Sequence, residues 1–407
     1  MRIVLLTELF GKNMGYLENV LPKYLARLGL DVHVVATDLP LNYRKKLATR
    51  PFNVLESQLR PGHLEVLDGY TLHIVGHKQV LGYMRMQGLQ QKLSSIRPTI
   101  VQTMTPIGWV GVDAAVLKPI LGYRLFTGCH HHASVFPLAT KRMSILAGER
   151  LHCVLTRTLP GRVVGRLTER CYAISQDCAD IARIFFGVPP AKIEVCPLGV
   201  DSEIFYPPAD ARDWAHRKQL RQNLGVNDCD ILCIYTGRLD ADKNPDILAR
   251  AVEQLSRLGR NFRALFIGEG DQKDSISSRR SCMTHPFVPF SELARFYRAA
   301  DIGVWPAQES MSMLDAAACG IPIVVNDTMS VAERIDGNGL RFRFNDVDDL
   351  LRALIALEDS TVRRQMGVYG AKKIARQFSW DSIARQRLRD YQTAILRCTS
   401  KNILGTE

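Results

Sequence analysis

One stretch of the chain, residues 309–322, constrains the fold more than any other part of the sequence. An apolar run at residues 302–305 precedes it, and a second apolar run at residues 323–325 follows it. This order predicts a strand, a polar loop, a short helix and another strand. That succession is the repeating unit of a parallel sheet that carries helices on its faces.

The helix in this stretch is predicted to present a ligand-binding end. Ser312 is placed to cap a helix that begins near Met313. The first N–H groups of such a helix are free and lie at the positive end of its dipole, which favours an anion such as phosphate. Two carboxylates flank the helix start, Glu309 in the loop and Asp315 in the first turn, and they can accept hydrogen bonds from sugar hydroxyls. Alternatively, Asp315 only stabilises the helix N-terminus and Glu309 is solvated.

The same stretch resembles the acidic signature of the retaining, nucleotide-sugar-dependent glycosyltransferases of the GT-B fold, in particular family 4. In that family a Glu, seven further residues and a second Glu lead into Ala-x-Ala-Cys-Gly-x-Pro. Asp315 takes the second Glu position, directly before the Ala-Ala-Ala-Cys-Gly-Ile-Pro of residues 316–322. Glu309 takes the first position, but only five residues separate it from Asp315, so the loop is two residues shorter than the common pattern.

The length and composition fit a globular enzyme of two domains. The 407 residues leave room for two domains of roughly 200 residues each. No apolar run approaches the roughly 20 residues that span a bilayer, and the first residues lack the apolar core of a signal peptide. The ten cysteines contain no C-x-x-C pair, so we expect buried free thiols in a reducing compartment and a cytoplasmic chain.

The net charge of +12 suits phosphorylated substrates, an anionic membrane face or nucleic acid. Nucleic acid is the least favoured partner, because the aromatic and basic residues are not interleaved as in single-strand binders. Residues 141–172 combine seven Lys and Arg residues with an apolar set, which is typical of a helix that binds a membrane surface. Alternatively, this segment is a core helix with solvated arginines, and the basic surface is inert.

The first residues predict a βαβ unit. A strand at residues 2–7, a helix at 16–28 and a strand at 32–36 follow one another, and Gly15 lies in the first connection. Ligands of open α/β sheets bind at this edge. In the resembling family this loop touches the donor diphosphate and the acceptor, so Gly15 is the candidate for a close backbone approach. Residues 44–61 are basic and lack periodicity, and we expect a mobile excursion there that recognises the acceptor.

Three consecutive histidines follow a further predicted strand of the first half. Strands are predicted at residues 71–75, 100–103 and 125–127, and the histidines occupy positions 130–132. Neighbouring side chains of an extended segment point to opposite faces, so three in a row seldom converge on one ion, and no metal is predicted. In the family a His just after this strand lies beside the donor sugar, and His130 or His131 is the nearest match. Alternatively, one or two of the three satisfy backbone carbonyls.

The second half of the sequence contains another predicted phosphate-binding site. An apolar strand at residues 230–235 leads into a loop that contains Gly237, Arg238 and Lys243, and a helix is predicted from Pro245. Two cations therefore lie next to a helix N-terminus on the ligand edge of a sheet. The family has the same spacing, and there Arg and Lys hold the donor diphosphate. Alternatively, this is a capped loop with ordinary surface charges.

The resemblance implies a GT-B fold, with two doubly wound, Rossmann-like α/β domains that face each other across a cleft. Gly and Pro residues after a strand at residues 193–197 predict a domain linker. We expect an acceptor-side domain at residues 1–198 and a nucleotide-sugar domain at 199–380. A C-terminal helix at about 381–400 would pack back on the first domain.

The implied activity is transfer of a hexosyl unit from a nucleoside diphosphate sugar to a lipid-linked or glycan acceptor, with retention at the anomeric carbon. The acceptor would be reached by peripheral attachment to an anionic cytoplasmic membrane face. No metal or cofactor is expected beyond the donor, since cations stabilise the leaving diphosphate.

The catalytic candidates are Arg238, Lys243, Glu309, His130 and His131, and the donor-binding candidates are Gly15, Gly237, Ser312, Met313 and Asp315. Two alternatives stay open: another GT-B enzyme, such as a nucleotide-sugar epimerase or a phosphorylase, and a non-catalytic GT-B subunit that activates a partner.

Overall fold

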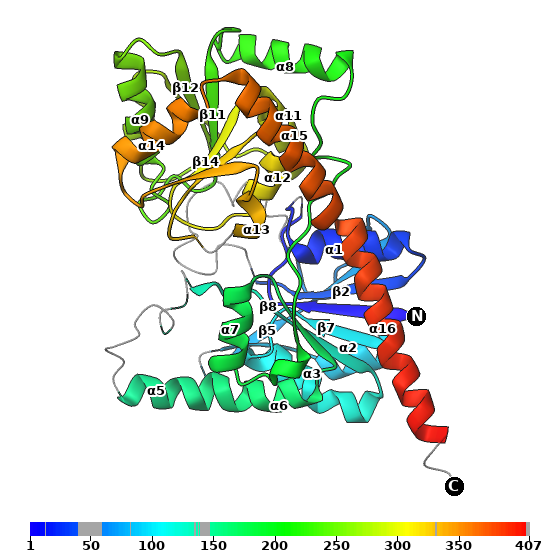
Figure 1. Ribbon diagram of the computed structural model, residues 1–407. Helices are drawn as coiled ribbons and strands as arrows, with labels where there is room; N and C mark the ends of the chain where they lie inside the picture. Colours follow the sequence, from blue (N-terminus) through cyan, green and yellow to red (C-terminus); the bar gives the residue numbers. More distant parts are fainter. Residues whose placement is uncertain are drawn as a thin grey trace. The chain divides into compact units, whose positions relative to one another are not determined.

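The computed structural model describes residues 1–12, 14–39, 59–81, 83–133, 136, 138, 147–329 and 332–403. These residues divide into two compact units. Unit 1 contains the described residues up to Leu198 together with those from Asp381 onward, and unit 2 contains Gly199–Trp380. Figure 1 shows a sheet with helices against its faces in each unit.

The sheet of unit 1 runs in the order β10-β9-β8-β7-β1-β2-β4-β3. Within the described residues its neighbours pair in parallel, apart from β3 and β4, which are antiparallel. The strands are β1 (Arg2–Thr7), β2 (Asp31–Thr37), β3 (Leu64–Leu67), β4 (Tyr70–Val75), β7 (Ile100–Thr103), β8 (Arg124–Cys129), β9 (Arg170–Ala173) and β10 (Ile193–Val195). A separate hairpin joins β5 (His77–Val80) to β6 (Tyr83–Met86).

Helices cover the sheet of unit 1, and the end of the chain supplies one of them. They are α1 (Leu17–Arg27), α2 (Leu89–Ile96), α3 (Gly108–Leu121), α5 (Ala147–Cys153), the π-helical turn η4 (Val154–Thr158), α6 (Leu159–Leu167), α7 (Gln176–Ile184), the short 3-10 turn η5 (Pro190–Lys192) and α16 (Trp380–Ile403). Tyr391 of α16 donates a hydrogen bond to Gln102 Oε1 at 2.6 Å, and its ring meets Phe126 edge-on. Buried aromatic contacts therefore attach α16 to the sheet of unit 1.

The sheet of unit 2 runs in the order β13-β12-β11-β14-β15-β16, and the neighbours in this order pair in parallel. Its strands are β11 (Ile231–Thr236), β12 (Phe262–Ile267), β13 (Cys282–His285), β14 (Ile302–Trp305), β15 (Ile323–Asn326) and β16 (Gly339–Phe342). Its helices are α8 (Ala211–Asn223), α9 (Asp246–Arg257), α10 (Lys273–Ser277), α11 (Phe290–Ala299), α12 (Ser312–Ala318), α13 (Ala332–Ile335), α14 (Val347–Ala356) and α15 (Ser360–Gln377).

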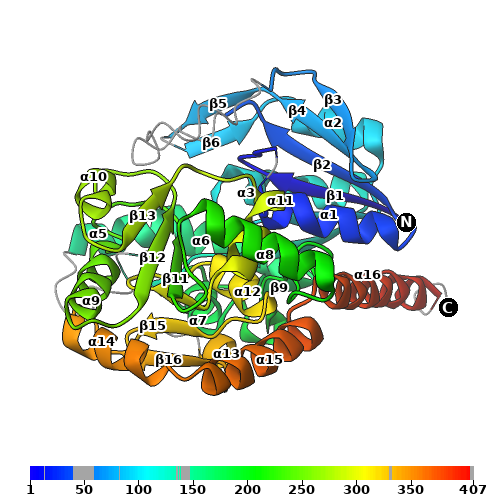
Figure 2. The same cartoon turned by 90° about the horizontal axis from the view of Figure 1, so that it is seen from above.

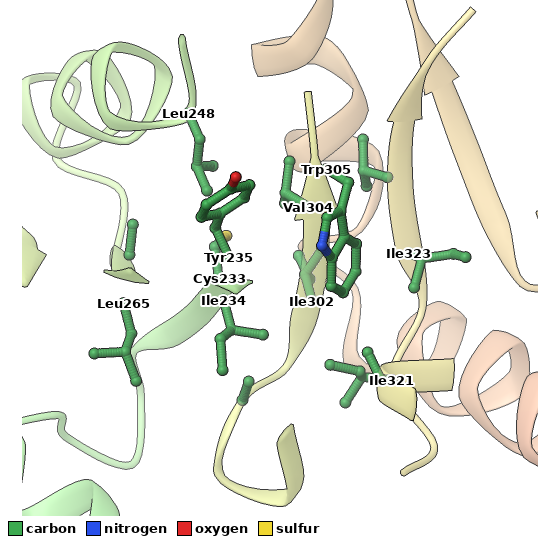
Figure 3. Close-up of a cluster of buried hydrophobic side chains, with 14 of the residues drawn as sticks. Cys233, Ile234, Tyr235, Leu248, Leu265, Ile302, Val304, Trp305, Ile321 and Ile323 are labelled. Carbon is green, nitrogen blue, oxygen red and sulfur yellow. The ribbon is translucent and has the colours of Figure 1, made fainter. Parts of the chain in front are cut away.

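The core of unit 2 explains why its strands read as continuous apolar runs. Every residue of β11 and β14 is buried, because helices cover both faces of a parallel sheet. Figure 3 shows Ile234 and Tyr235 of β11 beside Val304 and Trp305 of β14. On one face α9 and α14 pack side by side, and both views show them together (Figures 1 and 2).

The α/β fold class predicted from the sequence is confirmed, and the bounds of the predicted strands at residues 2–7, 100–103 and 302–305 coincide with β1, β7 and β14. The predicted start of the helix at Pro245 is wrong by one residue, because α9 begins at Asp246 with Pro245 directly before it. The predicted start near Met313 is confirmed, because α12 begins at Ser312. Most of the excursion predicted at residues 44–61 lies outside the described residues. The expectation of unpaired cysteines is confirmed for nine of the ten, and eight of these nine are buried.

Candidate active site

The candidate site of unit 2 lies where the strand order of its sheet reverses. β11 has β12 on one side and β14 on the other, so the connections from β11 and β14 leave in opposite directions. Crevices at such switch points are the usual ligand sites of open α/β sheets. A pocket of about 30 Å³ opens there at the carboxyl ends of both strands. It is lined by Tyr235, Thr236, Gly237, Lys243, Trp305, Pro306, Ala307, Gln308 and Ser310.

The loop after β11 has a backbone that only glycine suits at its first position. Gly237 has a φ of +148°, and a Cβ there would lie 2.8 Å from the Tyr235 hydroxyl. That hydroxyl donates a hydrogen bond to the Arg238 carbonyl oxygen at 2.9 Å. The backbone of Gly268 packs against that of Gly237, and a Cβ at position 268 would lie 2.0 Å from the Gly237 carbonyl oxygen. The turn that carries the two predicted cations is therefore held by close backbone packing.

The two predicted cations differ in their partners. Arg238 forms ion pairs with Asp240 at 2.5 Å and with Asp242 at 2.6 Å, so two carboxylates offset its charge. Lys243 instead donates a hydrogen bond to the neutral amide oxygen of Gln308. Burial, and after it the charge of Arg238, lowers the pKa of Lys243. Lys243 lines the pocket, whereas Arg238 lies beside it.

The capping of α12 differs from the prediction. Ser312 is the first helical residue, and its backbone N–H donates to Ser310 Oγ at 3.3 Å, so the predicted cap at Ser312 is wrong. The N–H of Met313 donates to the Ser310 carbonyl oxygen, and the Met313 side chain is fully buried. The physical reason is the short loop, in which Met311 already has helical backbone angles. The N–H groups of Ser312 and Met313, which were expected to be free, are thus already hydrogen-bonded within the loop.

Asp315 lies in the interior of unit 2. Its side chain is only 5% exposed, and burial together with the nearby Asp201 raises the pKa of the Asp315 carboxyl well above its usual range. Burial, and after it the charge of the nearby Asp315, raises the pKa of the Tyr297 phenol. The Tyr297 hydroxyl also hydrogen-bonds with Thr236 Oγ1 at 2.7 Å and with the Ser312 side chain. Glu309 is half-buried in the loop before α12.

The three consecutive histidines of unit 1 have three different environments. Burial, followed by the charges of neighbouring basic groups, lowers the pKa of His130 to about 4, so its imidazole is neutral. His131 packs edge-on against Phe136 and Phe186. His132 pairs with Asp177 at 3.2 Å. Although burial alone lowers the pKa of His132, its hydrogen bonds with Asp177 and Cys178 raise it to about 10.

His132, Asp177 and Cys178 form a group whose ligand atoms lie within 4.8 Å of one another, as a metal site requires. The carboxylate of Asp177 is already well satisfied. It accepts from the Ala133 N–H at 2.8 Å and from the Ser175 hydroxyl at 2.5 Å, in addition to pairing with His132. Ser175 directly precedes α7, and its hydroxyl donates to Asp177 instead of capping the helix. An ion pair that joins the histidine turn to the start of α7 accounts for this group.

The predicted residues fall into both units. In unit 2 the pocket brings together Gly237, Lys243 and the Ser310 that precedes α12, whereas Arg238, Glu309 and Asp315 are not among the described residues that line it. Gly15, half-buried between β1 and α1, lies in unit 1 together with His130 and His131. Sequence reasoning missed Gln308, because it concentrated on the charged residues. The available signal was its position directly before Glu309, in a loop that starts at the end of β14.

Comparisons with known proteins identify the family of the chain. The family described as Glycosyltransferase Family 4 matches residues 21–204, and the family described as Glycosyl transferases group 1 matches residues 230–360. A D-inositol 3-phosphate glycosyltransferase of Xylanimonas cellulosilytica is 30% identical over 264 residues, which cover 58% of this chain and 61% of that protein. The enzyme of the same name from Segniliparus rotundus is 24% identical over 90% of this chain and 85% of its own length.

Among solved structures, Anabaena HepE in complex with UDP-glucose superposes with a TM-score of 0.67 at 17% identity, covering 97% of this chain and 100% of that one. This likeness supports the GT-B fold. The two family matches fall on the two units: residues 21–204 begin in unit 1, and residues 230–360 lie in unit 2. The chain belongs to the family 4, group 1 glycosyltransferases, the retaining enzymes of the GT-B fold that use nucleotide-sugar donors.

Proposed function

We propose that this chain transfers a hexosyl unit from a nucleoside diphosphate sugar to an acceptor, with retention of the anomeric configuration. The observation that carries the proposal is the pocket between β11 and β14, where Lys243 lies at the carboxyl ends of both strands. A pocket with a cation at a switch point suits a diphosphate. Because HepE is similar in fold and its structure holds UDP-glucose, a uridine diphosphate sugar is the first donor to test.

The proposed chemistry breaks the bond between the anomeric carbon and the diphosphate oxygen. Negative charge grows on the leaving diphosphate, and a cation that is already in place lowers the barrier more than one that must move into position. We assign this role to Lys243, with Arg238 as the second cation. We keep Glu309 and one of His130 and His131 as the residues beside the donor sugar, and Gly15 and Gly237 as sites of close backbone approach. We also keep Asp315 as the residue that accepts hydrogen bonds from the ribose hydroxyls.

The deciding experiment is a binding and turnover screen of the purified chain. UDP-, GDP- and ADP-sugars are compared first by thermal shift, where a ligand at 100 times its Kd stabilises the folded state by about 2.7 kcal/mol. The donor that binds is then followed for release of its nucleoside diphosphate, with and without acceptors. Stabilisation and slow donor hydrolysis support the proposal, and a chain that binds no nucleotide sugar contradicts it.

The same screen separates the two alternatives. An epimerase would convert the donor without any acceptor, and a phosphorylase would need inorganic phosphate. A non-catalytic subunit would bind the nucleotide sugar but would not hydrolyse or transfer it.

We further propose that the acceptor is lipid-linked or a glycan, and that the chain attaches peripherally to an anionic membrane face. The continuous segment α5–η4–α6 has a buried side that includes Thr158 and Val164. Its other side exposes apolar residues, namely Leu151, Val154, Leu155, Leu159 and Val163. Arg162 and Arg166 are exposed on the same segment. Apolar side chains next to arginines are the usual composition of a helix that lies in a bilayer interface.

The residues of this segment differ in their contacts. Arg157 lies over the Phe136 ring at 4.9 Å and is therefore partly used in packing. Residues 141–146, at the start of the basic stretch predicted from the sequence, lie outside the described residues. Within the described residues, no helix is both long and apolar enough to cross a bilayer.

A further inference from the structure

The loop between β14 and α12 is anchored at both of its ends. The buried Asn326 donates a hydrogen bond from Nδ2 to the Pro306 carbonyl oxygen at 2.7 Å, which fixes the exit from β14. At the other end, Ser310 Oγ accepts from the Ser312 N–H at 3.3 Å. Gln308 lies between these two anchors and lines the pocket. Its backbone is therefore held in place by contacts that do not involve its own side chain.

The facing loop holds the backbone of Lys243 equally firmly. The Lys243 N–H donates to the Asp240 carbonyl oxygen at 3.0 Å. The next residue, Asn244, has a φ of +50° and donates a hydrogen bond to Asn345 Oδ1 at 2.7 Å. The four-carbon side chain of a lysine nevertheless keeps many rotamers, so a fixed backbone alone does not fix the ammonium. Gln308 can fix the ammonium, because its amide oxygen accepts a hydrogen bond from Lys243 Nζ.

The orientation of this amide follows from chemistry. An ammonium can only donate, so the oxygen of the Gln308 amide faces Lys243 and the NH2 group faces away from it. The amide is a neutral acceptor, so Lys243 forms no direct ion pair through it, although the carboxylates of Asp242, Glu309 and Asp240 lie close enough to act on its charge. Asp240 and Asp242 instead hold Arg238 directly. The pocket therefore offers an ammonium whose hydrogen-bond partner is neutral and, next to it, the two N–H donors of the Gln308 amide. Both are groups that bind a phosphate oxygen.

We propose that Gln308 is a positioning residue that holds the Lys243 ammonium toward the diphosphate and makes the pocket select a nucleoside diphosphate over the bare nucleoside. The inference rests on the proposed function and deepens it, because it names the part of the donor that this pocket recognises. It concerns a loop that is shorter than the family pattern, where this chain has an amide next to Glu309.

The test measures binding of UDP, GDP and ADP, and of the matching nucleosides, by titration calorimetry with the full chain. The variants are Gln308→Ala and Gln308→Glu, and Gln222→Glu, on the exposed side of α8, is the matched control for the added charge. For the diphosphate that the wild type binds best, Gln308→Ala should weaken binding by about 3- to 10-fold, the worth of one hydrogen bond. Gln308→Glu should weaken it by at least about 30-fold, because a carboxylate would neutralise Lys243 and repel phosphate. Nucleoside affinity and the control should not change.

The outcomes separate this inference from the proposed function. A wild-type chain that binds none of the diphosphates overturns the proposed function and this inference together. A wild type that binds a diphosphate, with Gln308→Glu binding it equally well, overturns only the inference. A Gln308 variant whose affinities for the diphosphate and for the nucleoside fall by the same factor also overturns the inference, because that pattern indicates a general structural defect. Melting temperatures within the error of the wild type confirm that the variants are folded.

Discussion

At the level of single residues, the charge of Arg238, which lies beside the pocket, is less available than that of Lys243, which lines it. Two carboxylates, Asp240 and Asp242, hold its guanidinium. Asp240 also accepts a hydrogen bond from the Asp271 N–H, so it belongs to the loop structure. Asp242 is exposed, with 49% of its side chain accessible, and is the partner that a diphosphate can displace. The ion pair with Asp242 thus competes with the donor for Arg238.

This competition predicts the effect of two substitutions. Arg238→Ala should lower kcat/KM by a factor that corresponds to a loss of roughly 1.5–3 kcal/mol of transition-state stabilisation. A charge-assisted contact is lost, and two carboxylates lose their counter-ion. Asp242→Asn should tighten nucleoside diphosphate binding, and it should partly restore the Arg238→Ala enzyme. A double-mutant cycle on kcat/KM measures the coupling. Arg257→Ala, on the exposed side of α9, is the control. Additive effects of the two substitutions would contradict the competition.

The ion pair between His132 and Asp177 predicts a pH-dependent stability. The pKa of His132 is raised to about 10, so its contribution is complete below the usual histidine pKa of about 6.5 and is lost as the pH rises toward about 10. The pKa of Asp177 is lowered by His132, Ser175 and the Ala133 N–H despite burial, so its contribution is lost only in acid.

Asp177→Asn should therefore reduce the free energy of unfolding most at about pH 5–6, and the difference from wild type should shrink between about pH 6.5 and about pH 10. Urea unfolding across this range measures it. Asp180→Asn, on the same helix and half-exposed beside Arg183, is the control and should have a small effect. A difference that stays constant up to the alkaline limit would show that the lost hydrogen bond to Ala133, and not the ion pair, carries the stability.

At the level of elements, the packing of α15 on α12 connects the core of unit 2 to the candidate site. Gly367 of α15 lies against the end of α12, and a Cβ there would meet the Gly320 carbonyl oxygen at 1.9 Å. Gly320 itself has a φ of +83° and lies against Pro207. The Gly320 carbonyl belongs to the backbone and cannot move as a flexible side chain can, so α15 approaches the end of α12 this closely because position 367 is a glycine.

Gly367→Ala should push these helices apart and lower the stability of unit 2 by about 1–3 kcal/mol, the usual cost of overpacking. The thermal unfolding midpoint measures the loss. Val368→Ala, at the next position and exposed, is the control for helix propensity. If Gly367→Ala unfolds at the same temperature as wild type, the close approach of the two helices is wrong.

The elements that could be predicted well from the sequence are the strands whose residues are all buried, because burial alone makes such a strand a run of apolar residues. β11 and β14 are buried on both faces, so each reads as an unbroken apolar run. Helix α8 was missed because it lacks an apolar stripe. Its buried residue is Arg221, which pairs with Asp301 at 2.8 Å and replaces the usual hydrophobic contact. Helix α3 was missed because glycines and Pro119 interrupt its pattern.

The candidate site shows the same limit. The Gly237, Arg238 and Lys243 spacing is local and could be read from the sequence. The state of Asp315 depends on Asp201, which approaches it only in the folded chain, so a local pattern cannot reveal a raised pKa. The role of Ser310 at the start of α12 depends on how the short loop closes, and the usual preference for a capping Ser at position 312 gave the wrong residue.

At the level of the whole molecule, the net charge of +12 and the exposed side of α5–η4–α6 favour the same partner. Leu155 is 55% exposed and Val163 is 52% exposed, which is costly in water for a ridge of such residues. Helix α3 packs beside α6 and exposes Val116 and Ile120 in addition. Apolar burial in a bilayer interface and attraction to anionic lipids would remove this cost together.

The final prediction concerns vesicle binding. The wild-type chain should co-sediment with anionic vesicles, more with increasing anionic lipid and less with added salt, since salt screens these charges. Arg162→Gln with Arg166→Gln should weaken binding by up to about 2 kcal/mol at low salt, and Leu155→Ser with Val163→Ser should weaken it at any salt. Arg257→Gln with Arg343→Gln removes the same charge from unit 2 and is the control. A wild type that ignores anionic vesicles at low salt, or a control that loses as much binding, would show that this segment is no membrane contact, and a soluble acceptor would then be favoured.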